Sequence, residues 1–282
     1  MKSKNVFSHI FCAVFVLIAL VSCSPASTTI TILHTNDTHS QVEPIESGKR
    51  DGNHAGYARR MGLIQRERAQ DEHLILVDAG DFGQGTAYFN LYHGRVEVDA
   101  MNRMRYDAIT LGNHEFDNGV DTLAAVLKDA NFAVVCANYD IQGTALEGIV
   151  KPYVILRRAG IKIGILGLGV NPIGLVAEKN FAPIKYLDPI PVAQEVSALL
   201  KHQLGCDLVV CLSHMGTFAN GDKPSDTLLA ESTRDIDVII GGHTHKIVAN
   251  HYVQNLDGDS VLLAQSGKSG ARIGKISIEM SE

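Results

Sequence analysis

Five short polar clusters in the sequence carry residue types that bind metal ions, and each cluster follows an apolar run. Together they supply carboxylates, imidazoles and one amide. A mixed set of this kind suits two divalent ions a few ångströms apart better than one structural zinc ion. The residue types therefore favour hydrolysis at phosphorus. The clusters are Asp37-Thr38-His39, Gly80-Asp81, Gly112-Asn113-His114-Glu115, the single His214, and Gly241-Gly242-His243-Thr244-His245.

Strand-like and helix-like segments alternate through the first half of the chain. Apolar runs predict the strands, and apolar residues at helical spacing predict the helices. This alternation is typical of βαβ units and predicts a mostly parallel sheet covered by helices. The expected strands are 29–34, 74–78, 108–111 and 132–137, and the expected helices are 57–69, 96–104 and 120–130.

The second half of the chain combines buried strands with hairpins. A glycine-containing turn at 157–160 separates two strand-like runs, and Asp257-Gly258 is a hairpin signal. The fold class is therefore α/β with some antiparallel pairing, and the polar clusters follow strand ends, where open α/β sheets bind ligands. The expected strands are 153–156, 161–168, 208–212, 236–240, 252–253, 261–264 and 273–280, with a helix at 191–203.

The ordered set of clusters resembles the signature of the calcineurin-like metallophosphoesterases. Three longer strings, at residues 33–39, 112–117 and 242–245, resemble the 5'-nucleotidase and UDP-sugar hydrolase family within that superfamily. The similarity covers about residues 28–280, nearly the whole mature chain. It implies a four-layer αββα sandwich, in which two mixed sheets lie face to face with helices outside.

The resemblance also implies a role for each polar residue. One metal ion would be bound by Asp37, His39 and His245, the other by Asn113, His214 and His243, and Asp81 would bridge both. Two such ions can supply a metal-bound hydroxide, and their identity is open among Zn, Mn, Fe and Co. His114 would then act on the leaving group and Asp117 would orient it. The alternative for Asp37 and Asp81 is turn formation or helix capping, and for His114 and Asp117 a place in the first turn of a helix.

The expected substrate is a small phosphate ester, most simply a nucleoside 5'-monophosphate. Phosphodiesterase or pyrophosphatase activity on cyclic nucleotides or nucleotide sugars is the alternative enzyme hypothesis, and a surface lipoprotein that keeps the fold without catalysis is a third. Typical 5'-nucleotidases continue into a substrate-binding C-terminal domain, whereas this sequence ends at Glu282. Base recognition is therefore unassigned, and specificity is broad, supplied by a partner, or built from residues 40–53 and 88–93.

The N-terminus predicts export and a lipid anchor. Lys2 and Lys4 precede a 12-residue apolar run at 10–21, which is too short to span a bilayer but suits a secretory signal. Ser22-Cys23 resembles a bacterial lipobox, so the expected parts are a signal peptide at 1–22, a tether at 23–28 that begins with lipidated Cys23, and a catalytic domain at 29–282. The alternatives are a plain signal peptide or an uncleaved anchor. The expected location is the periplasmic or cell-surface side of a bacterial envelope membrane.

Charge and cysteine usage exclude other classes of protein. Removal of residues 1–22 would take away two positive charges and no acids, which moves the net charge from −6 to −8 and disfavours binding of a nucleic acid polymer. Cys136 and Cys211 lie in apolar runs, which predicts buried free thiols. The segment at 114–118 lacks the second His of a metalloprotease motif, because residue 118 is Asn.

Two loops are candidates for the rim of the site. The polar stretch at 40–53 directly follows the first cluster and is long enough to border it. The glycine-rich segment at 265–270 contains Gly267-Lys268-Ser269 but lacks the first glycine of a P-loop. It is either a lining of the phosphate entrance or a plain hairpin turn.

Overall fold

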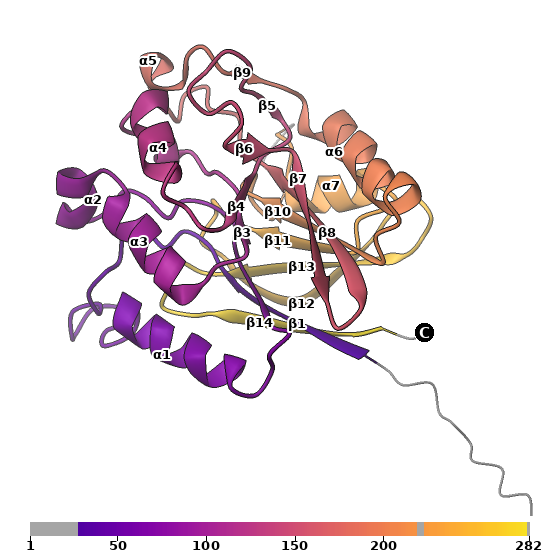
Figure 1. The fold of residues 1–282 in the computed structure, drawn as a ribbon, viewed down its shortest axis with the longest axis horizontal. Helices are drawn as coiled ribbons and strands as arrows, with labels where there is room; N and C mark the ends of the chain where they lie inside the picture. Colours follow the sequence, from indigo (N-terminus) through magenta and orange to yellow (C-terminus); the bar gives the residue numbers. More distant parts are fainter. Residues whose placement is uncertain (1–27, 219–222, 281–282) are drawn as a thin grey trace, which may run out of the picture.

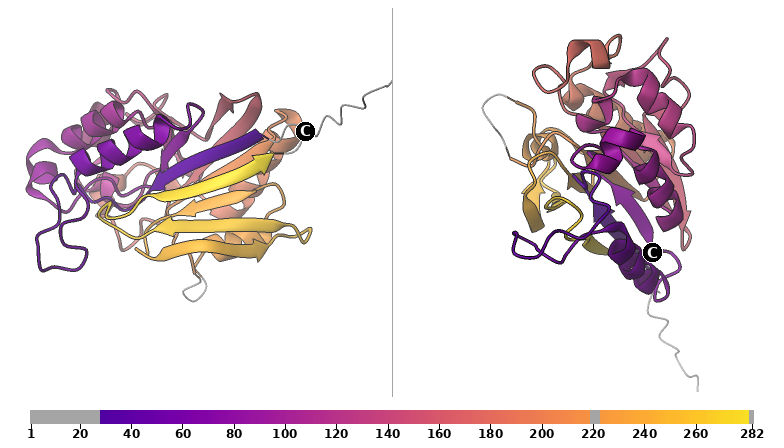
Figure 2. Two further views of the ribbon diagram at one scale, coloured as in Figure 1. Left: turned by 90° about the horizontal axis from the view of Figure 1, so that it is seen from below. Right: turned by 90° about the vertical axis from the view of Figure 1, so that its left-hand side faces the viewer.

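Two stacked β-sheets with helices on both outer faces form the chain, as the computed structural model shows for residues 28–218 and 223–280 (Figure 1). Helices of the N-terminal half pack on one sheet, and helices of the later half pack on the other (Figure 2). The predicted αββα sandwich is therefore confirmed. The predictions for residues 1–27, including the signal peptide and Cys23, lie outside the described residues.

The first sheet is parallel except at one edge, where the C-terminal strand pairs antiparallel with the first strand. This edge pairing joins Ile30 to Ile278 and His34 to Gly274. The chain therefore closes its first sheet with its last strand. In spatial order the strands are β14 (Gly274–Met280), β1 (Thr28–Thr35), β2 (Ile75–Asp78), β3 (Ala108–Ile109), β4 (Ala133–Val135) and β6 (Val150–Lys151).

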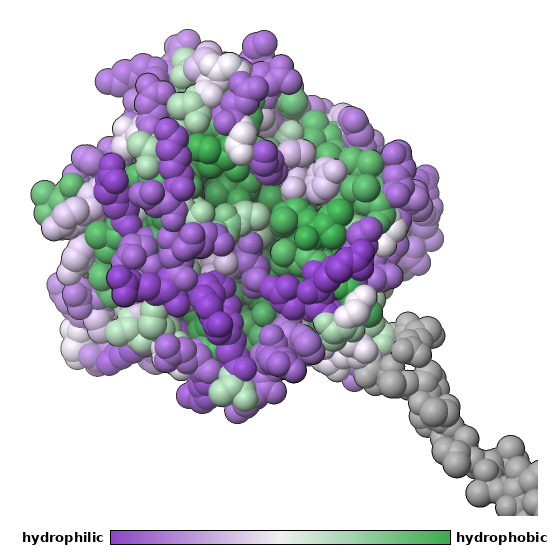
Figure 3. All heavy atoms as spheres, in the orientation of Figure 1, coloured by the Kyte–Doolittle hydropathy of each residue, from purple (hydrophilic) through white to green (hydrophobic). Residues whose placement is uncertain are grey.

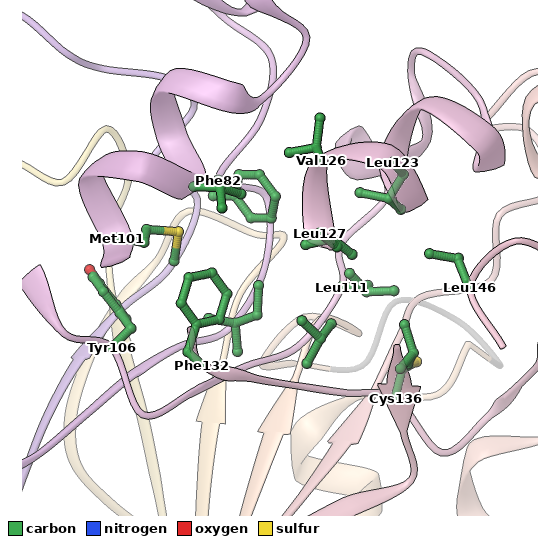
Figure 4. Packing of buried hydrophobic residues seen from close by; sticks show 14 of the residues in the cluster. Phe82, Met101, Tyr106, Leu111, Leu123, Val126, Leu127, Phe132, Cys136 and Leu146 are labelled. Atoms are coloured by element: carbon green, nitrogen blue, oxygen red, sulfur yellow. The ribbon is translucent and has the colours of Figure 1, made fainter. Parts of the chain in front are cut away.

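Helices α1, α3 and α4 cover the outer face of this sheet with a continuous apolar core (Figure 4). Leu33 and Leu76 point to this side from the strands, and Met101 and Leu127 meet them from the helices. The predicted helical spacing is thus confirmed. The helices are α1 (Tyr57–Arg68), α2 (Ala87–Tyr92), α3 (Arg95–Met104) and α4 (Val120–Leu127).

The second sheet has a parallel centre flanked by two antiparallel edge strands. Its hairpins turn at Ala159-Gly160 and near Gly258, where positive φ angles allow a tight reversal. Both predicted hairpins are confirmed. In spatial order the strands are β12 (Ile247–Gln254), β13 (Ser260–Ser266), β11 (Val238–Gly241), β10 (Leu208–Ser213), β8 (Ile161–Leu168) and β7 (Tyr153–Arg158).

Two helices of the later half cover this second sheet. The helix expected at 191–203 is present as α6 (Pro189–Ala198), with Asp188 as its N-cap and Pro189 in its first turn. The helical segment continues directly from α6 as a π-helix, Leu199–Gln203, which ends at the residue where the predicted helix ends. Helix α7 (Asp226–Ser232) has Ser225 as its N-cap, whose side chain accepts a hydrogen bond from the Leu228 backbone N–H.

Short elements that the sequence pattern did not predict surround these layers. They are α5 (Glu178–Phe181) and the two-stranded pair β5 (Tyr139–Asp140) and β9 (Lys185–Tyr186). Figure 3 shows a mostly hydrophilic surface with apolar side chains near its centre, over β7, whose residues are mostly half-buried. No helix among the described residues is long and apolar enough to cross a membrane.

Alternating side chains make the core between the sheets. In β10, Leu208, Val210 and Leu212 face the first sheet, whereas Val209 and Cys211 face the outer helices. Every residue of this strand is buried, which explains why its sequence is a continuous apolar run. The predicted buried thiols are also confirmed, since Cys136 and Cys211 are both buried and free.

Truncation of a side chain between the sheets should lower the free energy of unfolding. Leu212 is fully buried, so Leu212→Ala should destabilise the protein by about 2–5 kcal/mol, because it leaves a cavity between two rigid sheets. Urea denaturation followed by circular dichroism measures the change. Leu228→Ala makes the same chemical change at a side chain that is 38% exposed and should cost less. Equal losses would contradict the role given to the inter-sheet core.

Candidate metal centre

The polar clusters converge because they all follow strands of the two stacked sheets. Asp37 lies two residues after β1 and Asp81 three residues after β2, while His214 directly follows β10. The loops at the carboxyl ends of these strands meet at one edge of the sandwich. Strands from both sheets thereby bring residues more than 200 positions apart into contact, as with His39 and His245.

One group of metal-binding side chains consists of Asp37, His39 and His245. The Nε2 atoms of the two imidazoles are 3.0 Å apart, and His245 Nε2 lies 3.3 Å from Asp37 Oδ1. Asp37 is fully buried, whereas 37% of the His245 side chain is exposed. This group therefore has a closed inner side and an open outer side.

A second group consists of Asp81, His214 and His243. His214 Nε2 lies 3.0 Å from Asp81 Oδ2 and 3.9 Å from Asp37 Oδ1, which connects the two groups. His243 Nδ1 lies 3.1 Å from the amide oxygen of Asn113. All seven residues predicted as ligands are thus brought together.

The donor atoms of this cluster fit divalent cations. His214 Nδ1 lies 2.7 Å from the Ala79 carbonyl oxygen, an arrangement that fixes an imidazole with its other nitrogen free to bind metal. That other nitrogen, Nε2, is buried and has no well-aligned hydrogen-bond partner. A lone pair held beside a buried carboxylate is unfavourable unless a cation or a proton lies between them.

The charges of the second group depend on each other. Burial opposes ionisation of both His214 and Asp81, but their mutual attraction is stronger. It raises the pKa of His214 to about 10 and lowers the pKa of Asp81. Without a metal ion, the proton on His214 supplies the positive charge, so a divalent ion has to displace this proton.

Close backbone approach at the cluster requires glycine at two positions. A Cβ atom at Gly112 would lie 2.2 Å from Asp81 Oδ1 and 2.7 Å from His214 Nε2. A Cβ atom at Gly242 would lie 2.6 Å from His214 Nδ1. Any side chain here would occupy the space of a predicted ligand, which explains the Gly-Asn-His and Gly-His motifs.

Most predicted ligands have a backbone conformation that residues other than glycine rarely adopt. Asp37, His39, Asp81, His243 and His245 have φ angles between 44° and 69°. Asp and His tolerate this left-handed region better than most residues, yet it still costs energy. Five such residues around one cluster indicate a geometry kept for function rather than for stability.

Glu115 holds the loops of the cluster together, and sequence reasoning gave it no role. Its buried carboxylate accepts hydrogen bonds from the backbone N–H groups of Asp81, Gly83 and Gly112, at 2.9, 3.0 and 2.6 Å. Burial raises the pKa of Glu115 to about 7, although these N–H groups favour the charged form. The only signal in the sequence was its position in the Gly-Asn-His-Glu motif.

Asn36 connects the two sheets beside the cluster, and this role was also missed. Its side-chain oxygen accepts from the Ser266 backbone N–H and hydroxyl, at 2.8 and 2.7 Å. Its amide group donates to Asp37 Oδ2 and to the Gly267 carbonyl, at 2.6 and 2.7 Å. The end of β1 is thus fixed to the end of β13, which orients Asp37.

His114 and Asp117 form the pair that the sequence predicted. His114 Nδ1 lies 2.9 Å from Asp117 Oδ2, and this hydrogen bond raises the pKa of His114 against the effect of burial. The imidazole lies beside His39, with ring centroids 5.5 Å apart, and it is partly exposed. A 3₁₀ turn, His114–Phe116, places the pair at the mouth of the cluster rather than inside it.

The two loops proposed to border the site, at 40–53 and 265–270, both line one cavity, the second through Gly267, Lys268 and Ser269. Residues 41–51 line a cavity that reaches His245, as expected for a rim. The segment at 88–93, the other expected source of specificity, lies mostly in α2, in which Phe89 is buried and the Tyr88 hydroxyl donates to Glu43 of the loop, at 2.9 Å. This contact indicates a supporting role for α2 beneath the rim.

Two stacked mixed sheets with metal-binding residue types at their converging strand ends are typical of metal-dependent phosphoesterases. This chain belongs to the calcineurin-like phosphoesterase family, whose model matches residues 30–247. That family implies a requirement for divalent metal ions, and the two residue groups described above are the candidates to bind them.

Several relatives are named as 5'-nucleotidases. The snake venom 5'-nucleotidase of Crotalus adamanteus is 35% identical over 92% of this chain, and the 5'-nucleotidase of Homo sapiens is 32% identical over 90%. A solved 5'-nucleotidase precursor from Thermus thermophilus superimposes with a TM-score of 0.79 and 35% identity over 89% of the chain. This chain spans 47% of each of the two curated relatives and 51% of the Thermus chain.

Loss of the Glu115 charge should loosen the whole cluster. Glu115→Gln keeps the size of the side chain but turns an amide N–H₂ toward backbone donors, so buried N–H groups lose their acceptor. We expect a lower melting temperature and at least about tenfold weaker metal binding. Loss of a residue that orients metal ligands commonly weakens metal affinity by this factor or more. Calorimetric titration with Mn²⁺ measures the affinity. Unchanged affinity would show that Glu115 is not needed to order the ligand loops.

Proposed function

We propose that this chain is a dinuclear metal-dependent phosphohydrolase that removes phosphate from nucleoside 5'-monophosphates. The observation that carries the proposal is the contact between the two ligand groups, with His214 Nε2 3.9 Å from Asp37 Oδ1. Two ligand groups that meet this closely can bind two ions that act on one phosphate group. Relatives named as 5'-nucleotidases support the substrate class. The complete set of ligand types argues against a fold kept only for binding.

The ligand assignment is part of this proposal. Asp37, His39 and His245 would hold one ion, and Asn113, His214 and His243 the other, with Asp81 bridging them. Two observations support this assignment of ligands to the two ions. Asp37, His39 and His245 form one group of neighbouring ligand atoms, and His243 contacts Asn113. The ligand types allow Zn, Mn, Fe or Co. When bound, two such ions would lower the pKa of a water molecule and neutralise charge on the phosphoryl oxygens.

Residues of the chain complete the reaction around that centre. Asp117 binds the Nδ1 atom of His114. The Nε2 atom of His114 is therefore left to face the substrate and to donate a proton to the departing ribose oxygen. The backbone N–H of His114 donates to Asp81 Oδ1, at 2.9 Å, which fixes the position of this acid relative to a ligand. The leaving alkoxide is thus protonated as its bond to phosphorus breaks.

Activity against a panel of substrates tests the proposal directly. Purified protein should hydrolyse AMP in the presence of Mn²⁺, Zn²⁺ or Co²⁺, and faster than cyclic AMP or UDP-glucose. Asp81→Asn should abolish turnover, because it removes a charge that the ions need, while circular dichroism shows an intact fold. Full AMP hydrolysis by that variant with both ions bound would reject the bridging role. Faster cleavage of the cyclic or sugar nucleotide would make the chain a phosphodiesterase or pyrophosphatase.

Removal of the His114 imidazole should separate chemistry from metal binding. His114→Ala is expected to keep both ions and to slow AMP hydrolysis by roughly 10² to 10⁴-fold, the usual contribution of a general acid. Hydrolysis of p-nitrophenyl phosphate should fall much less, because its leaving group needs no proton. Steady-state kinetics on both substrates, with metal analysis, measure this.

Asp117→Asn provides the matched comparison for that experiment. It keeps the imidazole and removes the charge that orients it, so the same order of losses should appear in milder form. Equal losses on both substrates in the His114 variant, or the loss of an ion, would show that His114 binds metal or phosphate instead.

We also propose that residues 1–22 are a signal peptide, that lipidated Cys23 begins a tether at 23–28, and that residues 29–282 form the catalytic domain on the outer side of a bacterial membrane. The apolar run at 10–21 and the small residue before Cys23 support this proposal. Cys23→Ser should move the protein from the membrane fraction to the soluble exported fraction. Cell fractionation with a high-salt wash measures this, and a variant that stays in the membrane would favour an uncleaved anchor.

A further inference from the structure

The turn at 242–246 supplies one predicted ligand to each ion, because it carries both His243 and His245. His243 belongs to the group of Asp81, and His245 belongs to the group of Asp37. Both histidines have a left-handed backbone, with φ angles of 69° and 55°. This conformation costs energy, so the turn keeps it only where surrounding contacts hold it.

Gln265, near the end of β13, contacts the turn at both of its ends. Its amide N–H₂ donates to the Gly242 carbonyl, at 2.6 Å, and its amide oxygen accepts from the Lys246 backbone N–H. The Thr244 hydroxyl, in the middle of the turn, donates to the same oxygen, at 3.1 Å. One side chain thus binds the first, the middle and the last residue of the turn.

The hydrogen-bonding capacity of this amide is fully used. A primary amide offers two donor hydrogens and two acceptor lone pairs. The fourth bond of Gln265 goes to the Thr217 hydroxyl, at 3.2 Å, in the segment that follows His214. Only 1% of Gln265 is exposed, so the loss of its amide would leave buried polar groups without their partner.

Gln265 is itself held by a rigid part of the fold. Strand β13 lies between β12 and β11 in the second sheet, and Gln265 pairs with Val248 of β12. The next residue, Ser266, donates to the Asn36 side chain through its backbone N–H and its hydroxyl, at 2.8 and 2.7 Å. These contacts use no predicted metal-binding atom, so they do not compete with an ion.

We infer that Gln265 is a positioning residue that keeps His243 and His245 in their binding conformation before either ion is bound. The inference rests on the proposed function, because it assigns the two histidines to different ions. Without Gln265, the first ion would have to order the turn, and the second ion would meet a turn that is already ordered. Gln265 therefore removes an ordering cost that would otherwise weaken the first binding step.

Stepwise binding of Mn²⁺ to the metal-free full chain tests the inference. Gln265→Met keeps the length of the side chain and removes all four hydrogen bonds of the amide. The first dissociation constant should rise about tenfold or more, and the second should rise much less. Calorimetric titration gives both constants. Equal weakening of the two steps, or unchanged affinity in both, would overturn the inference.

Hydrogen exchange in the metal-free protein tests the same inference without any ion. The Lys246 N–H loses its acceptor in Gln265→Met, so peptides that cover 242–246 should exchange faster. Thr244→Val removes only the hydroxyl bond, at an exposed residue, and should show the same changes in milder form. Unchanged exchange of the turn in Gln265→Met would contradict its role.

Asn255→Leu is the matched control, because it removes another buried amide from the same pair of strands. Asn255 is 8% exposed, and its side chain makes three hydrogen bonds to backbone groups. It lies at the other end of β13, roughly 20 Å from Gln265 along the strand. This variant should melt at a lower temperature but keep both Mn²⁺ constants and the exchange of the turn. A change in the ratio of the constants would show that general loss of stability is the cause.

Failure of the proposed function gives a different result, because binding and exchange are measured without turnover. Absence of AMP hydrolysis, together with the expected changes in Gln265→Met alone, would reject the substrate and support the role of Gln265. AMP hydrolysis by the protein with two ions bound, together with the same Mn²⁺ constants and exchange in Gln265→Met, would support the function and reject that role.

Discussion

The structure depends on the concentration of carboxylates and imidazoles in one nearly dry place between two sheets. Asp37 and His214 are fully buried, and Asp81 is only 2% exposed. Both carboxylates lie within 4.0 Å of His214 Nε2. Like charges repel more strongly where water is excluded, so the arrangement is stable only when cations compensate the carboxylates. In the protein alone, the proton on His214 provides part of this compensation, as its pKa of about 10 indicates. The fold therefore prepares a site that gains most when divalent ions bind.

Rigid layers make this arrangement possible. The apolar core between the sheets fixes the strand ends, and residues behind the ligands then fix the loops. Glu115 joins the loops that carry Asp81 and Gly112, while Asn36 joins the first sheet to the second. The buried hydrogen bonds of Glu115 and Asn36 hold the left-handed backbone of the ligands in place. This backbone conformation is strained, and the stability of the sheets offsets its cost.

Much of this organisation could be predicted from the sequence, because the strongest signals are local. The continuous apolar run of β10 predicts a buried strand, and the turn at Ala159-Gly160 predicts a hairpin. The polar motifs predict the types of metal ligand. The roles of Glu115 and Asn36 could not be predicted, because they depend on contacts with distant backbone groups that leave no periodic pattern. The cavity that reaches His245 could not be predicted for the same reason, since Arg50 and Lys246, which both line it, are far apart in the chain.

Metal stoichiometry tests the central claim most directly. Protein stripped by a chelator should be inactive toward AMP and should regain activity as Mn²⁺ or Zn²⁺ is added, with full turnover only when two ions per chain are bound. Metal analysis and initial rates, measured on the same samples, give this relation. Full activity with one ion per chain, or activity that survives complete removal of metal, would contradict a dinuclear centre built from these two ligand groups.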